Sequence, residues 1–250
     1  MGLDIYAGTL TRYYAHNWRT ATQQWAEANG YGFQRIVPDG TERGETDPTA
    51  IQSGVEGWRD RILAAISQSG AIWPEDNEKP YYTDKPDWDA FGAMLLVAAC
   101  HVYGEPVPET VEKGWDYIAH PLIRRMGEDP AQGWSLLRGA EWWLPIEDTF
   151  LFQAPCLNGA QIIMATAGLL RWELEKLNKL AWQADEAAIL EWSRTEGYPM
   201  DGQIDGAGRL AMGETHQVYN TQSLAKFAFS IFWQALNFAQ ENRVPILLDY

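Results

Sequence analysis

Thirteen tryptophans in a chain of 250 residues are the feature that most limits what this sequence can fold into. A buried aromatic side chain removes roughly 150–250 Å² of surface from water, so this many indole rings require a large packed interior. The chain is 46% hydrophobic and 21% charged, which is typical of a folded protein and excludes intrinsic disorder. Its length is enough for one large core or two small ones.

The charge of the chain narrows the choice of partners. It carries 34 Asp and Glu residues against 19 Lys and Arg, a formal net charge of −15. Such a surface keeps a protein soluble, and it also suits a basic protein partner or an imitation of nucleic acid. Binding to nucleic acid or to an anionic membrane needs clustered cations, and the pair Arg124–Arg125 stands alone. We therefore expect neither nucleic acid nor a membrane as a partner.

The cysteines and the apolar stretches indicate the compartment. Two cysteines, Cys100 and Cys156, fit a reducing environment, although they leave a disulfide open. The opening MGLDIYAG lacks the basic and apolar regions of a signal peptide. The longest apolar stretches, Phe91–Cys100 and Ile162–Leu170, are too short to span a bilayer. These features predict a cytoplasmic protein.

The hydrophobic pattern predicts an α+β fold, mostly helical, with a small sheet that includes the N-terminal strand. Strands are expected over Leu3–Tyr14 (broken at Gly8), Tyr31–Val37, Thr149–Gln153 and Val244–Tyr250, the last able to pair with Leu3–Tyr6. Helices are expected over Asn17–Asn29, from Pro48 to a stop at Gly70, and over Ala90–Tyr103, Glu109–Ala119, Asn158–Leu180, Asp185–Arg194 and Gln222–Asn242.

The chain is expected to form a single domain over residues 1–250. Residues 74–87 hold three prolines and many charges, so they are the alternative place for an internal boundary. Residues 197–214 hold five glycines and are predicted to be a loop.

No metal or cofactor site is predicted. The chain has no CxxC and no HExxH spacing, and its four histidines are scattered. The run Asp201–Gly206 resembles the first half of an EF-hand loop, but Met212 stands where the bidentate Glu is needed. The run Gly206–Ala211 matches a dinucleotide fingerprint without the preceding strand that the mechanism requires. A glycine-rich turn explains both runs.

Two weak sets of residues suit catalysis. Glu147 and Asp148 follow Trp142–Trp143, and a carboxyl group beside tryptophan can hold a raised pKa, as in glycosidases. Glu214 and His216 would share one face of a strand. Together they indicate a hydrolase that acts on a small molecule or a carbohydrate. The sequence does not show two carboxylates facing one cleft.

Cys156 is the more interesting thiol. It precedes the helix predicted to begin at Asn158, whose dipole would favour a thiolate. The alternative is a structural cysteine.

Adjacent aromatic residues indicate a binding surface. On a strand, the two members of Tyr13–Tyr14 or of Trp142–Trp143 point to opposite faces. If one face is core, the other ring is left for solvent, a ligand or a partner; the alternative is that both faces are covered. These four residues are the candidate partner surface.

The first fourteen residues, MGLDIYAGTLTRYY, resemble the start of a family of bacterial proteins that open with MGLDIY. That family has no assigned activity, so the resemblance implies no site residues. Short acidic bacterial proteins are often suspected of immunity or inhibitor roles. With the −15 charge and no catalytic motif, we expect a non-enzymatic binding protein of this type. Its acidic, aromatic-bearing surface would meet a basic protein partner, and the hydrolase is the alternative.

Overall fold

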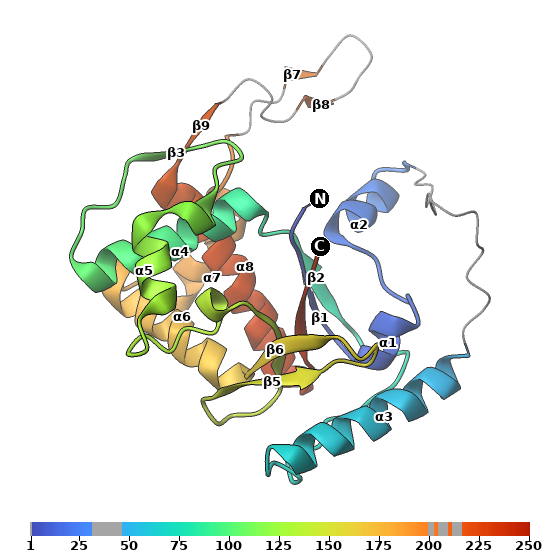
Figure 1. The fold of residues 1–250 in the computed structure, drawn as a ribbon. Coiled ribbons are helices and arrows are strands. Elements are labelled where there is room, and N and C mark those ends of the chain that lie inside the picture. Colours follow the sequence, from blue (N-terminus) through green and yellow to red (C-terminus); the bar gives the residue numbers. More distant parts are fainter. Residues whose placement is uncertain (1, 32–46, 200–202, 205–209, 212–216) are drawn as a thin grey trace.

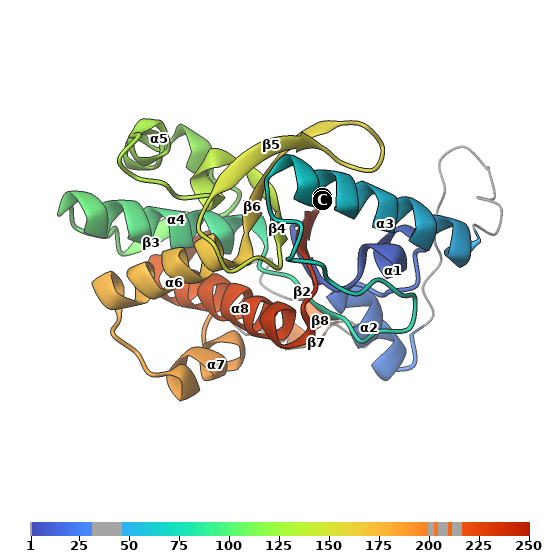
Figure 2. The same ribbon diagram turned by 90° about the horizontal axis from the view of Figure 1, so that it is seen from below.

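The computed structural model describes residues 2–31, 47–199, 203–204, 210–211 and 217–250. The fold is α+β and mostly helical, as predicted. A mixed sheet stands between two groups of helices (Figure 1). On one side lie α4 (Trp88–Tyr103), α6 (Ala167–Ala181) and α8 (Thr221–Asn242); on the other lie α1 (Leu10–Tyr14) and α3 (Pro48–Ala65). Figure 2 shows the same separation from below.

The remaining elements are short. The other helices are α2 (Ala21–Ala28), α5 (Pro121–Glu128), α7 (Glu186–Thr195) and the 3₁₀ turns η1 (Tyr117–Ala119) and η2 (Leu136–Arg138). The strands are β1 (Asp4–Ala7), β2 (Tyr82–Asp84), β3 (Thr110–Glu112), β4 (Ala140–Leu144), β5 (Leu151–Pro155), β6 (Gln161–Thr166), β7 (Gln203–Ile204), β8 (Leu210–Ala211), β9 (Val218–Asn220) and β10 (Ile246–Asp249).

Both ends of the chain meet inside the main sheet. In the described chain its strand order is β2-β1-β10-β4-β6-β5, with β4 and β6 parallel and the other neighbours antiparallel. The register joins Ile5 to Leu248 and Ala7 to Ile246. The predicted pairing of the N-terminal and C-terminal strands is therefore confirmed. The proline-rich segment 74–87 supplies β2, the edge strand beside β1.

Each face of the sheet packs on a separate core. Ile5, Trp143 and Ile246 belong to the larger core, with α4, α6 and α8. Their strand neighbours Tyr6, Trp142 and Leu247 belong to a second core, with α1 and α3. Because side chains alternate along a strand, one sheet can separate two apolar interiors.

Helix α4 is the most deeply buried helix. All of its residues from Ala90 to Cys100 are buried, which is expected of a helix that is apolar on every side. Asp87 caps its start by accepting a hydrogen bond from the Trp88 N–H, and Gly104 ends it in the left-handed conformation. The predicted helix Ala90–Tyr103 is confirmed, two residues longer at its start.

Several predicted elements are wrong. Residues 10–14 form α1 instead of a strand, because the Thr9 side chain caps a helix there. Thr20, not Asn17, starts α2, through a capping box with Gln23. The predicted helix 109–119 is a strand, β3, followed by a turn. Residues 161–166 form β6, and the helix predicted from Asn158 begins only after Thr166.

The predicted strand Tyr31–Val37 lies outside the described residues except for Tyr31. Residues 197–214, predicted to be a loop, include the short paired strands β7 and β8 in their described part. In the part of the chain that is described, no helix is long and apolar enough to cross a membrane.

Replacing Leu247 tests the central position of β10. Leu247 is fully buried, and its strand pairs with both β1 and β4. Leu247→Ala should lower the free energy of unfolding by about 2–5 kcal/mol, since it removes buried methyl groups and leaves a cavity. Leu180→Ala, at a leucine that is 39% exposed, should cost well under that amount. Urea denaturation measures the stability of both variants. An equal loss of stability in the two would contradict the central position of β10.

Candidate functional site

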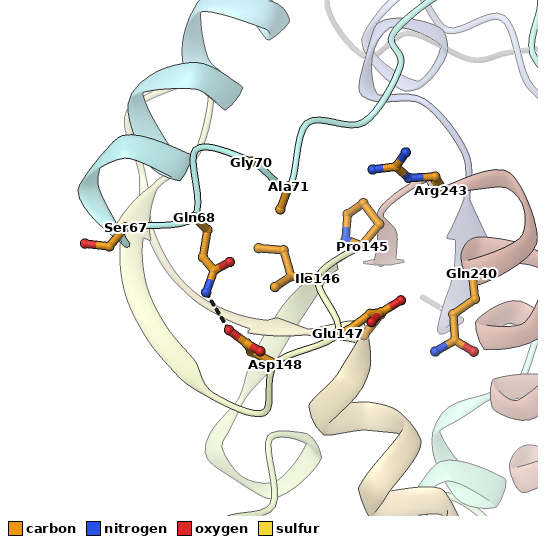
Figure 3. A pocket seen from close by; sticks show the side chains of 11 residues that line it. Ser67, Gln68, Gly70, Ala71, Pro145, Ile146, Glu147, Asp148, Gln240 and Arg243 are labelled. Atoms are coloured by element: carbon orange, nitrogen blue, oxygen red, sulfur yellow. Dashed lines mark hydrogen bonds between the residues drawn. The ribbon is translucent and has the colours of Figure 1, made fainter.

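The predicted carboxylates Glu147 and Asp148 line the mouth of a surface hollow (Figure 3). It has a volume of about 760 Å³ and lies between the end of α3, the turn after β4 and the end of α8. Gln68 donates a hydrogen bond to Asp148 across it, at 2.6 Å. Arg243, on the opposite side, donates to the carbonyl oxygen of Ile72 at 3.0 Å.

The start of α6 fixes the turn that carries these carboxylates. The Gly168 N–H donates to the carbonyl oxygen of Ile146 at 2.9 Å, and the Thr166 hydroxyl donates to that of Asp148. A Cβ atom at Gly168 would collide with the Glu147 carbonyl oxygen. Only glycine allows the turn to lie this close to the helix.

The two carboxylates do not converge on one point. Asp148 reaches Gln68, whereas Glu147 extends toward the side of Gln240 and Arg243 (Figure 3). Both side chains are exposed. A pair that exchanges protons on a substrate needs to flank one bond, so this arrangement gives little support to glycoside cleavage. The other predicted catalytic residues, Glu214 and His216, lie outside the described residues.

Trp142 and Trp143 do not form a partner surface, and this part of the prediction is wrong. Trp142 is 6% exposed and Trp143 is 0% exposed. They point to opposite faces of β4, and each face packs on its own core. The sequence left open whether one face or both faces of this strand are covered, and both are.

Tyr13 and Tyr14 lie half-buried at the edge of the second core, on α1 and not on a strand. The Tyr13 ring stacks on Trp18, with centroids 5.6 Å apart, and Tyr14 lies 6.4 Å from Trp142. The Tyr13 hydroxyl donates a 2.5 Å hydrogen bond to Asp249, at the end of β10. Tyr13 therefore connects this aromatic cluster to the carboxylates at the end of the sheet.

Those carboxylates form a cluster, which we call the acidic corner. It consists of Asp4 (β1), Asp84 (β2), Asp249 (β10), and Asp87 and Asp89 at the start of α4. Asp4 and Asp249 are direct cross-strand partners, an arrangement of like charges that destabilises a sheet.

Burial and mutual repulsion act together in the corner. Burial is the largest cause that raises the pKa of Asp4, and the carboxylates of Asp249, Asp87 and Asp84 raise it further. The charge of Lys85 acts in the opposite direction and lowers the pKa of Asp4. Burial likewise raises the pKa values of Asp84 and Asp89.

The carboxylates of the corner differ in their hydrogen bonds. Asp84 accepts from the Lys85 N–H at 2.7 Å, Asp87 from the Trp88 N–H at 2.8 Å and Asp89 from the Gly114 N–H at 3.0 Å. By contrast, the buried Oδ1 of Asp4 has no hydrogen-bond donor among the described residues. A buried polar atom without a partner costs free energy, so it marks a place where a donor would be stabilised.

The backbone at Asp87 is unusual as well. Its φ of 58° and ψ of 159° fall in a region that non-glycine residues rarely adopt. Such a conformation persists only where the surrounding structure holds it, and it turns the chain from the sheet edge into α4.

Aromatic rings flank the corner. The rings of Trp88 and Tyr250 meet edge to face with centroids 5.4 Å apart, and Trp88 stacks on Tyr117 at 6.3 Å. Tyr250 is 58% exposed. The acidic corner therefore has aromatic rings beside its carboxylates, and these rings are not among the four aromatic residues that the sequence predicted for a partner surface. The predicted pairing of the chain ends was the signal that could have placed Asp4 beside Asp249.

The described residues contain no group of three or more His, Cys, Asp or Glu side chains arranged to hold a metal ion. Comparison with known protein families, curated proteins and solved structures gives no match to this chain.

The environment of Cys156 differs from the predicted one. It follows β5 in a turn, and the helix predicted to begin at Asn158 begins only at Ala167, so the predicted helix N-terminus is not beside it. It is buried and its thiol donates to Asn158 Oδ1 at 2.8 Å. Cys100 is buried too, and both cysteines are free.

Thiol labelling tests this environment. Both cysteines should react with a disulfide reagent about tenfold or more slowly in the native protein than after unfolding, because burial keeps the thiolate from the reagent. Two thiols should be counted in denaturant without reductant. Rapid native labelling that disappears in Cys156→Ser would contradict the buried position.

A pair of glycine substitutions tests the turn that carries Glu147. Gly168→Ala should destabilise the protein by about 1–3 kcal/mol or more, because the added Cβ overlaps the turn. Gly70→Ala is the matched control on the same hollow, since nothing lies within 4 Å of its Cβ. It should change stability by about 0.5 kcal/mol or less. Thermal unfolding curves compare the two.

Proposed function

We propose that this protein is a non-enzymatic, cytoplasmic binding protein whose acidic corner receives a basic segment of a protein partner. An inhibitor of the immunity type is the concrete form of this function. The cluster of like charges at Asp4, Asp84 and Asp249, in which Asp4 and Asp249 are direct cross-strand partners, is the observation that carries the proposal.

A cationic side chain fits this place on two grounds. Its charge relieves the repulsion among Asp4, Asp84 and Asp249, which the charge of Lys85 opposes at Asp4. The guanidinium group of an arginine or the ammonium group of a lysine can also pack on the neighbouring rings of Trp88 and Tyr250, because both groups are attracted to aromatic faces.

The net charge of −15 supports the same choice of partner. A strongly acidic surface speeds the encounter with a basic protein and repels acidic ones. The hydrolase alternative has less support, because Glu147 and Asp148 are exposed and diverge.

Titration with peptides tests this proposal. A short peptide rich in Lys and Arg, followed by NMR, should shift the signals of Asp4, Asp84 and Asp249 and their neighbours, whereas a neutral peptide of equal length should not. The affinity should fall as salt is raised from about 0.15 M to 1 M, because the Debye length drops from about 8 to 3 Å.

Charge-matched variants give the control. Asp4→Asn with Asp87→Asn should weaken peptide binding about fivefold or more, since each removes a charge while Asn retains capping ability at Asp87. Glu147→Gln with Asp148→Asn removes the same charge outside the corner and should have little effect. Equal weakening by both pairs would mean that binding depends on net charge alone, and would overturn the proposal.

A further inference from the structure

A second hollow, with a mostly apolar lining, lies between α4 and α5. It has a volume of about 320 Å³, and its walls come from α4, η1, α5 and the turn that contains η2. Small-molecule sites in proteins are concave and mostly apolar, with a few polar groups that orient the ligand. The apolar and aromatic side chains of this lining include Phe91, Leu95, Tyr117, Ile118, Ile123 and Leu137.

The lining runs from the interior of the protein to its surface. Phe91, Leu95 and Ile123 are buried and belong to the larger core, whereas Ile118 is 65% exposed. A molecule that covers Ile118 and the hollow beside it removes apolar surface from water, which favours binding. An engineered apolar cavity of roughly 150 Å³ binds benzene, so this hollow has room for an aromatic ring or a short hydrocarbon chain.

The charge around this hollow differs in sign from that of the whole chain. Residues 117–139 supply three of the four walls, and they hold three arginines against two carboxylates, Glu128 and Asp129. The chain as a whole has a net charge of −15. This part of the surface therefore favours an anion more than most of the molecule does.

Arg124 is the arginine that lines the hollow. The other two arginines are engaged elsewhere, since Arg125 lies over the Tyr103 ring at 3.9 Å from its centroid and Arg138 donates to the carbonyl oxygen of Asp129 at 3.0 Å. Arg124 is exposed, and within the described part of the chain its side chain makes no hydrogen bond, ion pair or ring contact. Its guanidinium group is therefore available to an anionic group on a ligand.

We propose that this hollow binds a small amphipathic carboxylate, a molecule with one anionic head and a hydrocarbon or aromatic body. The body lies against Phe91, Leu95 and Ile123, and the carboxylate accepts hydrogen bonds from Arg124, because a guanidinium group matches the geometry of a carboxylate. Glu128 also lines the hollow and acts against an anion, so the two charges of the lining can be tested in opposite directions. The site goes beyond the proposed function and does not depend on the acidic corner.

Titration of the protein with butyrate, hexanoate and octanoate, followed by calorimetry, tests the apolar part of the site. The affinity should rise about three- to fourfold for each added methylene group, because each one buries further apolar surface. Octylamine has the same body with a cationic head and should bind about tenfold or more weakly than octanoate, since it meets Arg124. Affinities that do not depend on chain length, or equal binding of octylamine and octanoate, would overturn the proposal.

NMR of the methyl groups locates the bound molecule. Octanoate should shift the methyl signals of Ile118, Ile123 and Leu137 before those of other residues. Shifts confined to other residues would overturn the proposal, and so would the absence of carboxylate binding, which is the result expected if the hollow instead receives an apolar side chain of a protein.

Single charge changes on the surface test the role of Arg124. Arg124→Gln should weaken octanoate binding about fivefold or more and leave the binding of neutral 1-octanol unchanged, because only the carboxylate uses the guanidinium group. Glu128→Gln should strengthen octanoate binding. Arg61→Gln, at an exposed arginine of α3 across the sheet, is the matched control and should have little effect. Equal weakening by Arg124→Gln and Arg61→Gln would mean that only the net charge matters, and would overturn the assignment of Arg124.

Discussion

The pairing of the two chain ends in the middle of the sheet is the constraint on which the rest of the structure depends. Strand β10 lies between β1 and β4, so the last residues of the chain complete both halves of the sheet. Because side chains alternate on β1 and β10, this one pairing places Ile5 and Ile246 in one core and Tyr6 and Leu247 in the other. It also brings Asp4 opposite Asp249, and so creates the acidic corner.

Two buried carboxylates play a similar part on opposite sides of the sheet. Glu75 accepts hydrogen bonds from the N–H groups of Leu10 and Thr11, in the first turn of α1, and from Trp73 Nε1. Glu173 accepts from two consecutive N–H groups at the start of η2. The first turn of a helix leaves N–H groups without intrahelical partners, and a carboxylate that accepts from them satisfies these donors. Each carboxylate thereby fixes a short helix to a distant segment.

These contacts explain what the sequence could and could not predict. The long helices α4 and α8 and the terminal strand carry their own signals in apolar periodicity, capping residues and glycine stops, and they were predicted within about two residues. The short elements depend on partners far along the chain. Glu75 lies 65 residues from Leu10, and Glu173 lies 38 residues from Ser135, so local pattern could not reveal α1 or η2. The prediction that Trp142 or Trp143 is exposed failed for the same reason, because the helices that cover both faces of β4 come from other parts of the chain. The acidic corner joins four segments, and only the β1–β10 pairing hinted at it.

Zero-length carbodiimide cross-linking to a lysine-rich peptide, with the joined residues mapped by mass spectrometry, tests the central claim most directly. The chain offers 34 Asp and Glu side chains, many of them more exposed than those of the corner. If the acidic corner receives a basic partner, the cross-links will concentrate on Asp4, Asp84, Asp87 and Asp249 and will disappear at high salt. Cross-links spread over exposed carboxylates such as Glu147 and Glu191, in proportion to their exposure, would contradict the account.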